Sequence, residues 1–477
     1  MTMIGRRIGF VSTRFAGTDG VSLETAKWAT VLEGLGHSCF YFAGRSDRPA
    51  AVSEVVPEAF FGHPDIEAIT RAVFAAYAVD RRGDDRGSGE PLARDRGPVD
   101  RGGAPDGAVR IVRPPEVSAA IDSLRARLRA ALHRFVRRFG IELLVVENAS
   151  AIPLNLPLGL AISDLVAETG LPTIAHHHDL PWERQRFLVN AVEDVIAAAF
   201  PPAHPTIRHV VINSLQAREL AWRRGLTPRV IPNVMAFEQP PTPPHPGRLA
   251  ALRHDLGLRP GELLVLQPTR IVARKGIEHA IEFVRRLERP ATLVISHASG
   301  DEGDAYERRI RDYAALLGVP LALAADLVAE NGGAVPVGGP AEGPAEGARS
   351  VEPEARPEPT RYSLAEFYAA ADFVTYPSVF EGFGNAFLEA VYHRRPILVN
   401  NYSTYEVDLR PRGFRVVWFD EFIDEATIRQ ARRLLDEPAT AAAWADRNYE
   451  VGRRHFSYAV LERHLTALLV DCFGAAG

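Results

Sequence analysis

Residues 377–400 read PSVFEGFGNAFLEAVYHRRPILVN, and this stretch decides the fold class because three structural signals follow one another within it. A strand expected over 373–376 ends at Pro377, two glycines lie in the following loop, and a helix begins near Asn385. The next apolar run, 397–400, is expected to be another strand. A strand, a glycine-containing loop, a helix and a second strand form the repeating unit of a parallel sheet covered by helices.

The loop and the start of this helix also indicate an anion site. Gly382 and Gly384 let the backbone approach a ligand closely, and the N–H groups and dipole of a helix start attract negative charge. A diphosphate fits this outline, with Glu389 accepting hydrogen bonds from ribose hydroxyls and Glu381 holding a sugar hydroxyl near the reacting carbon. Taken alone, the pattern fits a glycine turn with two solvated glutamates equally well.

The same alternation of strands and helices runs through most of the chain. The strands expected in the first half cover 7–12, 38–43, 142–147, 173–177 and 209–213. Those expected in the second half cover 263–268, 292–296, 373–376, 397–400 and 415–418. Six prolines within 232–246 interrupt the alternation, because proline suits neither a helix interior nor a central strand.

These patterns predict an α/β protein with two doubly wound, Rossmann-like domains. The domains are expected at 1–235 and 251–455, joined by a linker at 236–250, with a final helix in 456–477 that packs back on the first domain. Two segments, 81–107 and 331–360, are rich in glycine and proline. We expect both to be disordered insertions, since their apolar surface cannot offset the entropy lost on ordering.

Composition and charge exclude several classes of protein. The chain has 477 residues, of which 46% are hydrophobic and 24% charged, as in soluble globular proteins. A net charge of −5 provides no basic field, so nucleic acid is not an expected partner. Two cysteines cannot form a disulfide framework, and the sequence shows neither a signal peptide nor an apolar stretch that would span a membrane. A cytoplasmic location is expected.

Lysine is nearly absent from the basic residues, because only Lys27 and Lys275 of the 55 lysines and arginines are lysine. A lysine that survives such a bias marks a site that needs a compact ammonium group. Lys275 lies in PTRIVARKG, 268–276, where Arg270 closes an expected strand. Ligands bind at this end of parallel strands, so both cations are expected to stabilise a diphosphate leaving group. Exposed loop charges are the alternative interpretation.

The first expected strand is followed by a turn that contains Gly17 and Gly20. This turn resembles a phosphate-binding turn, but neither GxGxxG nor GxxxxGK[ST] is present. The readings as a classical NAD-binding protein or a P-loop protein therefore lose their main support. A plain tight turn explains the two glycines as well.

Three histidines in a row end the fourth expected strand. Alternation along a strand puts His176 and His178 on one side and His177 on the other. The first two, with Asp179, have the chemistry of zinc ligands, but no further cluster of histidine or cysteine is near in the sequence, and we expect no metal. We favour a histidine that hydrogen-bonds a substrate hydroxyl and an Arg184 that meets an anionic acceptor. A solvated helix face is the alternative for the arginine.

A basic amphipathic helix is expected just before the third strand. Its apolar stripe consists of Leu124, Leu128, Leu132, Phe135 and Phe139, and arginines lie beside it. Such a helix can lie on anionic lipid, so contact with a membrane is one interpretation. A helix packed on its own domain, with arginines in water, is favoured because a strand follows immediately.

Taken together, these motifs resemble glycosyltransferase family 4, whose members are retaining enzymes of the two-domain GT-B fold. The matching pieces cover nearly the whole chain except the two insertions. They are GTDGVSLETAKWATVLEGLGH at 17–37, HHHD at 176–179, PTRIVARKG at 268–276, ISHASGDEGDAYERRI at 295–310, and the E-x7-E arrangement within PSVFEGFGNAFLEA at 377–390. The chain departs from the family at VYHRRPIL, where small residues are usual.

The resemblance implies a role for each matching residue. Arg270 and Lys275 would hold the donor diphosphate, Glu389 would bind ribose, and Glu381 would face the transferred sugar. Backbone groups would contact the phosphates at Gly20, Gly384, Asn385 and Ala386. His178 would touch the sugar or the acceptor hydroxyl. The remaining acceptor contacts are expected from His176, Asp179 and Arg184.

We therefore expect a metal-independent hexosyltransferase without a cofactor. It would move a hexosyl group from a nucleotide sugar, a UDP- or GDP-hexose, to a small polar acceptor. The arginines after HHHD favour an acidic acceptor. One alternative is a peripheral membrane enzyme that glycosylates a lipid. Alternatives of another class are a nucleotide-sugar epimerase and a protein that binds nucleotide sugars without catalysis.

Overall fold

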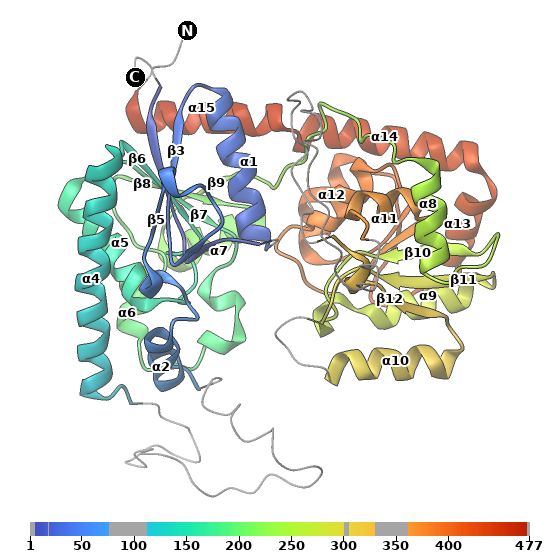
Figure 1. The fold of residues 1–477 in the computed structure, drawn as a ribbon, viewed down its shortest axis with the longest axis horizontal. Coiled ribbons are helices and arrows are strands. Elements are labelled where there is room, and N and C mark those ends of the chain that lie inside the picture. Colours follow the sequence, from blue (N-terminus) through green and yellow to red (C-terminus); the bar gives the residue numbers. More distant parts are fainter. Residues whose placement is uncertain (1–4, 18, 76–111, 300–304, 330–360, 475–477) are drawn as a thin grey trace, which may run out of the picture. The chain divides into compact units, whose positions relative to one another are not determined.

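The computed structural model describes residues 5–17, 19–75, 112–299, 305–329 and 361–474 (Figure 1). The insertions expected at 81–107 and 331–360 lie outside the described residues. The chain divides into two compact units. The first runs up to Val234 and takes up the chain again from Tyr458, and the second runs from Met235 to Ser457.

Two helices lie near the boundaries between the units. Helix α8 (Pro246–Asp255) begins inside the segment expected to be a linker. Its proline occupies the first helical position, where a fixed φ and a missing N–H do no harm. Helix α15 (Tyr458–Phe473) belongs to the first unit, and its Leu461 and Leu465 share a core with Trp28 of helix α1 (Gly20–Gly34).

The first unit is built on a parallel sheet of seven strands in the order β5-β3-β1-β6-β7-β8-β9. The strands are β1 (Arg7–Val11), β3 (Ser38–Ala43), β5 (Ser53–Val55), β6 (Leu143–Glu147), β7 (Thr173–His177), β8 (Ile207–Val211) and β9 (Arg229–Val230). A separate pair is formed by β2 (Arg14–Phe15) and β4 (Arg45–Ser46). The other helices are α2 (Pro64–Val73), α4 (Pro115–Phe139), α5 (Leu156–Thr169), α6 (Glu193–Ala199) and α7 (Ser214–Arg224).

Apolar side chains cover both faces of this sheet. On one face α1 and α15 bury Leu32 and Leu465 against the strands. On the other face α4 and α5 bury Phe135 and Leu165 (Figure 1). Strands with apolar layers on both sides read as continuous apolar runs, which explains why the sequence reveals them.

The second unit is built on a parallel sheet of six strands in the order β12-β11-β10-β13-β14-β15. The strands are β10 (Leu263–Gln267), β11 (Ala291–Ile295), β12 (Leu321–Leu323), β13 (Phe373–Tyr376), β14 (Ile397–Asn400) and β15 (Val417–Phe419). Besides α8, the helices are α9 (Ile277–Leu287), α10 (Ala305–Leu317), α11 (Leu364–Ala370), α12 (Asn385–Tyr392), α13 (Glu425–Asp436) and α14 (Pro438–Phe456).

Two Rossmann-like parallel sheets confirm the predicted fold class. Strands β3, β7, β13 and β14 have the predicted bounds, whereas β8 begins two residues earlier than predicted. The sequence prediction missed β5, β9 and β12, because edge strands of two or three residues are too short to show a pattern.

The strand order reverses direction once in each sheet. Strand β1 lies between β3 and β6, and β10 lies between β11 and β13. Ligands of open α/β sheets bind outside the carboxyl ends of the strands at such a point. Each unit therefore brings together the loops that carry the motifs of the sequence.

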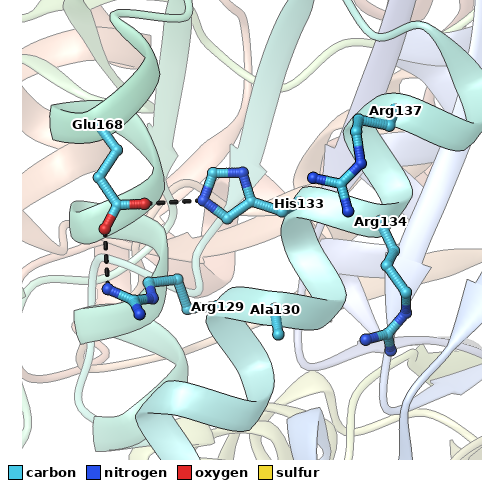
Figure 2. A pocket seen from close by; sticks show the side chains of 6 residues that line it. All are labelled: Arg129, Ala130, His133, Arg134, Arg137 and Glu168. Atoms are coloured by element: carbon cyan, nitrogen blue, oxygen red, sulfur yellow. Dashed lines mark hydrogen bonds and ion pairs between the residues drawn. The ribbon is translucent and has the colours of Figure 1, made fainter.

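The apolar stripe of α4 is buried in the first unit. Leu128, Leu132 and Phe135 have no exposed surface, so the stripe packs on the domain as favoured above and is not available to lipid. Figure 2 shows the outer side of α4, where Arg129 and His133 point toward Glu168 of α5 and both donate hydrogen bonds to its carboxylate, at 2.8 Å each. Among the described residues, no helix is both long and apolar enough to cross a membrane.

Candidate active site

In the second unit, the loops after β10 and β13 meet at the carboxyl edge of the sheet. The backbone N–H of Val379 donates to the carbonyl of Arg274 at 2.9 Å. Gly276 has φ +58, and a Cβ there would lie 2.5 Å from the carbonyl oxygen of Pro377. Only glycine permits this approach, which brings Lys275 to Glu381.

Glu381 and Lys275 form a buried ion pair, with exposed fractions of 7% and 8%. Lys275 Nζ donates a short hydrogen bond to Glu381 Oε1, and Arg274 Nη1 donates to Oε2 at 3.1 Å. Burial acts to raise the pKa of Glu381, but the two cations hold it below its ordinary value. The carboxylate is therefore ionised and fixed in orientation.

The two loops carry more positive than negative charge. Residues 268–276 and 377–384 contain Arg270, Arg274 and Lys275 but only one acidic residue, Glu381. Burial, together with Lys275 and Arg270, lowers the pKa of His297, which follows β11. The surplus of two positive charges matches the charge of a diphosphate. The sequence prediction did not include Arg274, although its place beside Lys275 was the available signal.

The start of α12, predicted to bind an anion, is built around Gly384. Gly384 is its N-cap residue, with φ +119, and it has no side chain that could cap the helix. A Cβ on Gly384 would lie 2.4 Å from the hydroxyl of Tyr402, which donates to the carbonyl of Phe383 at 3.0 Å. Glycine is therefore required, and the first turn, which includes Asn385 and Ala386, carries no acidic side chain.

Glu389 is held by an aromatic pair. The hydroxyl of Tyr368 donates to Glu389 Oε2 at 2.8 Å, and its ring stacks on His393 with centroids 4.9 Å apart. Burial and then Arg395 lower the pKa of His393 to about 4, so this ring is neutral at pH 7. The segment in which the chain departs from the family thus supplies the ring that orients Tyr368.

In the first unit, the side chains of β6 and β7 form a second cluster. Glu147 lies opposite His176 in the register of the two strands. Its Oε2 accepts hydrogen bonds from His176 Nδ1 at 2.9 Å and from His178 Nε2 at 3.1 Å. Burial acts to raise the pKa of Glu147, but the two imidazoles hold it at about 2. The sequence prediction missed this carboxylate.

The backbone around His178 is equally well fixed. Asn148, a non-glycine residue with φ +59, turns its side chain so that Oδ1 accepts from the N–H of His178 at 3.0 Å and of Asp179 at 3.3 Å. Gln216 Nε2 donates to the carbonyl of His178 at 3.1 Å. Asparagine is one of the few residues that tolerate this conformation.

One acceptor contact predicted from the sequence, that of His176, is corrected by these positions. His176 is 1% exposed, and its ring stacks on Trp28 with centroids 4.3 Å apart. It supports Glu147 and cannot touch an acceptor directly. Arg184 donates to Asp179 at 2.5 Å, and both side chains are partly exposed, so the acceptor contacts of these two residues stay predictions.

The turn before α1 contains a carboxylate that the prediction did not consider. Asp19 caps the helix, and its Oδ1 accepts from the N–H groups of Val21 and Ser22 at 3.2 Å each. A carboxylate at a helix start takes the place that an anion would occupy. The N–H of Gly20 is not one of the two that Asp19 accepts from, and its contact with a phosphate stays a prediction.

Glu147, His176 and His178 are also the only three acidic, histidine or cysteine residues in the described part of the chain whose ligand atoms lie close enough to hold a metal ion, all within 4.8 Å of one another. Two imidazoles and a carboxylate are a donor set that zinc accepts. In the structure Glu147 Oε2 is the hydrogen-bond partner of both rings.

Lys27, the other lysine, has a structural position. Its Nζ donates to Glu24 Oε2 at 2.9 Å and to the carbonyl of Val234 at 2.6 Å. Val234 is the last residue of the first unit before the chain enters the second. Lys27 thus ties α1 to the point where the chain leaves the unit.

His177 lies on the opposite face of β7 from its neighbours, as alternation predicts. Its Nε2 and His209 Nδ1 are hydrogen-bonded at 2.9 Å, and both rings are buried. Burial lowers the pKa of both, and with the charge of Arg224 it brings that of His209 to about 4.

This buried pair predicts a loss of stability in acid. Unfolded histidine takes up a proton below about pH 6.5, whereas folded His209 stays neutral down to about pH 4. The unfolded chain binds more protons over this window, so the free energy of unfolding should fall by roughly 3 kcal/mol between pH 6.5 and 4. Denaturant unfolding at several pH values measures it. His209→Gln should flatten the dependence, and an unchanged slope would contradict the assignment.

Comparison with known proteins gives relatives of matching length. The chain matches no family model. It is 28% identical, over 96% of its length and 98% of that protein, to a mannosylglucosylglycerate synthase of Thermotoga maritima. It is 29% identical, over 86% of each chain, to a mannosylglucosylglycerate synthase of Petrotoga mobilis.

Solved structures share the fold at low sequence identity. A glycosyltransferase from Rickettsia africae covers 99% of each chain with a TM-score of 0.62 at 11% identity. Sucrose-phosphate synthase from Thermosynechococcus elongatus covers 98% of this chain and 100% of its own, with a TM-score of 0.58 at 15% identity. Anabaena HepE in complex with UDP and glucose has the same coverage and TM-score at 12% identity. These structures confirm the two-domain GT-B fold.

Proposed function

Because the chain is a glycosyltransferase of the GT-B fold, we propose that it is a retaining hexosyltransferase. It moves a hexosyl group from a nucleotide diphosphate sugar to a hydroxyl of a small acidic acceptor. The observation that carries the proposal is the buried pair of Lys275 and Glu381, with Arg270 and Arg274 beside it, at the carboxyl ends of β10 and β13. A surplus of positive charge there favours a diphosphate and its departure.

Three parts of the second unit bind the donor. The cations of the loop after β10 offset the charge that develops on the leaving diphosphate. The backbone from Gly384 to Ala386 binds phosphate oxygens at the start of α12. Glu389, oriented by Tyr368, accepts hydrogen bonds from the ribose hydroxyls.

The reaction needs no covalent intermediate on the protein. The acceptor oxygen forms a bond to the anomeric carbon on the face from which the diphosphate leaves, and the carbon–oxygen bond to the diphosphate breaks. The acceptor proton passes to the leaving phosphate oxygen. Glu381 is held by two cations, which makes its carboxylate a weak nucleophile, so its role is to orient a sugar hydroxyl. The proposal includes neither a metal nor a cofactor.

The acidic acceptor rests on the names of the relatives and on Arg184, whose side chain is paired with Asp179 but partly exposed. Both relatives are named for a product in which two sugars are joined to glycerate, which carries a carboxylate. In the first unit Arg184 is paired with Asp179, and an acceptor carboxylate would compete with Asp179 for this guanidinium. Both cysteines are free, which accords with the cytoplasmic location we propose.

The donor base can be found by a thermal-shift screen. A ligand that binds only the folded state raises the melting temperature, by about 2.7 kcal/mol of added stability at one hundred times its dissociation constant. We expect one of UDP, GDP and ADP, with its hexoses, to raise it clearly and the other two to raise it little. Release of that nucleotide should then depend on an added hydroxy acid or its glucoside. No shift with any nucleotide would contradict the proposal.

A further inference from the structure

Glu147 is a charged group that the proposed reaction does not use. Its side chain is fully buried at the carboxyl end of β6, beside the point where the strand order reverses. A buried carboxylate is costly unless cations or hydrogen-bond donors surround it. Oε2 has two imidazole donors, whereas Oε1 has no hydrogen-bond partner among the described residues. The two imidazole rings are therefore the groups that this buried carboxylate binds.

The contacts around His178 differ from those of a residue that only fills space. Glu147 accepts a hydrogen bond from its ring Nε2, and Asn148 accepts one from its backbone N–H. Gln216 donates one to its carbonyl. Its ring and its backbone are thus both fixed by side chains, which come from β6, from the loop after β6 and from α7. With Nε2 engaged, Nδ1 is the ring nitrogen that is left for a substrate.

Charge favours a proton on His178 rather than on His176. Burial lowers the pKa of both rings, but for His178 the hydrogen bond and charge of Glu147 outweigh burial, so that its pKa is raised. Glu24 and Asp179 act on His178 in the same direction. Glu24, the other buried carboxylate that acts on His178, already has Lys27 as its partner. Glu147 and His178 are therefore matched as anion and cation.

We propose that Glu147 is a positioning residue that, together with Asn148, holds His178 as a charged hydrogen-bond donor whose Nδ1–H meets an oxygen of the transferred sugar or the acceptor. This inference rests on the proposed function, in which His178 touches the substrate. Glu147 itself touches no reacting atom and acts only through His178. His176, stacked on Trp28, donates to the same oxygen of Glu147 and helps to fix the carboxylate.

A double-mutant cycle tests whether the two residues act as one unit. In Glu147→Gln the side chain keeps its size but loses its charge, and its amide nitrogen cannot accept a hydrogen bond. We expect kcat to fall about a hundredfold, as for the loss of one oriented donor, with little change in the affinity for the nucleotide diphosphate. In a His178→Gln background the same change should cost less than about threefold. A full further loss there would overturn the proposal.

Two controls separate positioning from damage to the fold. Glu142→Gln, at the other end of β6, removes a partly exposed glutamate paired with Arg6 and should leave kcat unchanged. Zinc should be absent from the purified protein. Stoichiometric zinc that is lost in Glu147→Gln would instead identify Glu147, His176 and His178 as metal ligands and overturn the proposal.

A readout without turnover keeps the inference distinct from the proposed function. In protein labelled with 15N in its histidines, the His178 signal is assigned by its loss in His178→Gln. We expect this ring to carry both protons at pH 7 in the wild type and to become neutral in Glu147→Gln. A neutral ring in the wild type would contradict the inference even if transfer activity is found, and a charged ring would support it even if the substrate class proves wrong.

Discussion

Glu381→Gln is expected to lower kcat about a thousandfold while nucleotide diphosphate binding is retained or strengthened. The amide cannot accept hydrogen bonds from both cations and a sugar hydroxyl as the carboxylate does, and the loss of one such contact in a buried site costs two to three orders of magnitude in rate. Lys275 and Arg274, which donate to Glu381, would then be free to bind phosphate. Initial rates with saturating donor, and melting temperatures with and without nucleotide, measure the two effects.

The matched control for this variant is Glu406→Gln, which changes an exposed glutamate after β14 and should leave the rate within threefold of the wild type. If Glu381→Gln also retained its rate, Glu381 would have no part in the chemistry. A wild type that bound nucleotide sugars but never transferred the hexose would have no rate to lose, and this result would favour a non-catalytic binder.

The sequence was sufficient to predict the position of a candidate residue where that position depends on a single loop. Glu381 and Lys275 each follow a strand at a glycine-containing turn, and both lie at the carboxyl edge as predicted. Their direct pairing was not predictable, because it requires β10 and β13 to be neighbours although more than one hundred residues separate the two side chains. Strand order is a property of the whole sheet and leaves little trace in either loop.

Glu147 shows the same limit more sharply. In the sequence it ends an apolar run and looks like the last residue of a buried strand. Its role beside the histidines depends on the register of β6 and β7, which places it opposite His176. The histidines were found because three in a row are conspicuous, whereas the carboxylate that binds them lies 29 residues away from His176.

Local interactions that the prediction did not consider lie beside two of its residues. Arg184, expected to meet an anionic acceptor, is paired with Asp179, five residues earlier. Gly20 was expected to bind phosphate, and Asp19 caps the same helix by accepting from the N–H groups of Val21 and Ser22. Both carboxylates were visible in the sequence, and each adds a negative charge near the group assigned to a ligand.

The two lysines provide the second large prediction. Lys275→Arg should lower kcat/KM for the donor about a hundredfold, although the charge is kept. Lys275 Nζ lies in a buried space between Glu381 and the ring of Tyr376, 5.4 Å from its centroid. The planar guanidinium is larger and cannot replace a compact ammonium there. Lys275→Met, which leaves Glu381 buried with only Arg274 as its cation, should cost a further tenfold or more.

Lys27→Arg is the internal control, because it makes the same change at the other lysine. Lys27 holds Glu24 and the carbonyl of Val234, so the expected effect is a lower melting temperature with kcat/KM of the folded enzyme within threefold of the wild type. The bias toward arginine acts on both positions alike, but lysine is kept at each for a different physical reason. Lys27 has a structural contact, and Lys275 is part of the donor site. Equal kinetics for Lys275→Arg and the wild type would mean that any cation suffices at the donor site, and the argument from a compact ammonium would fail.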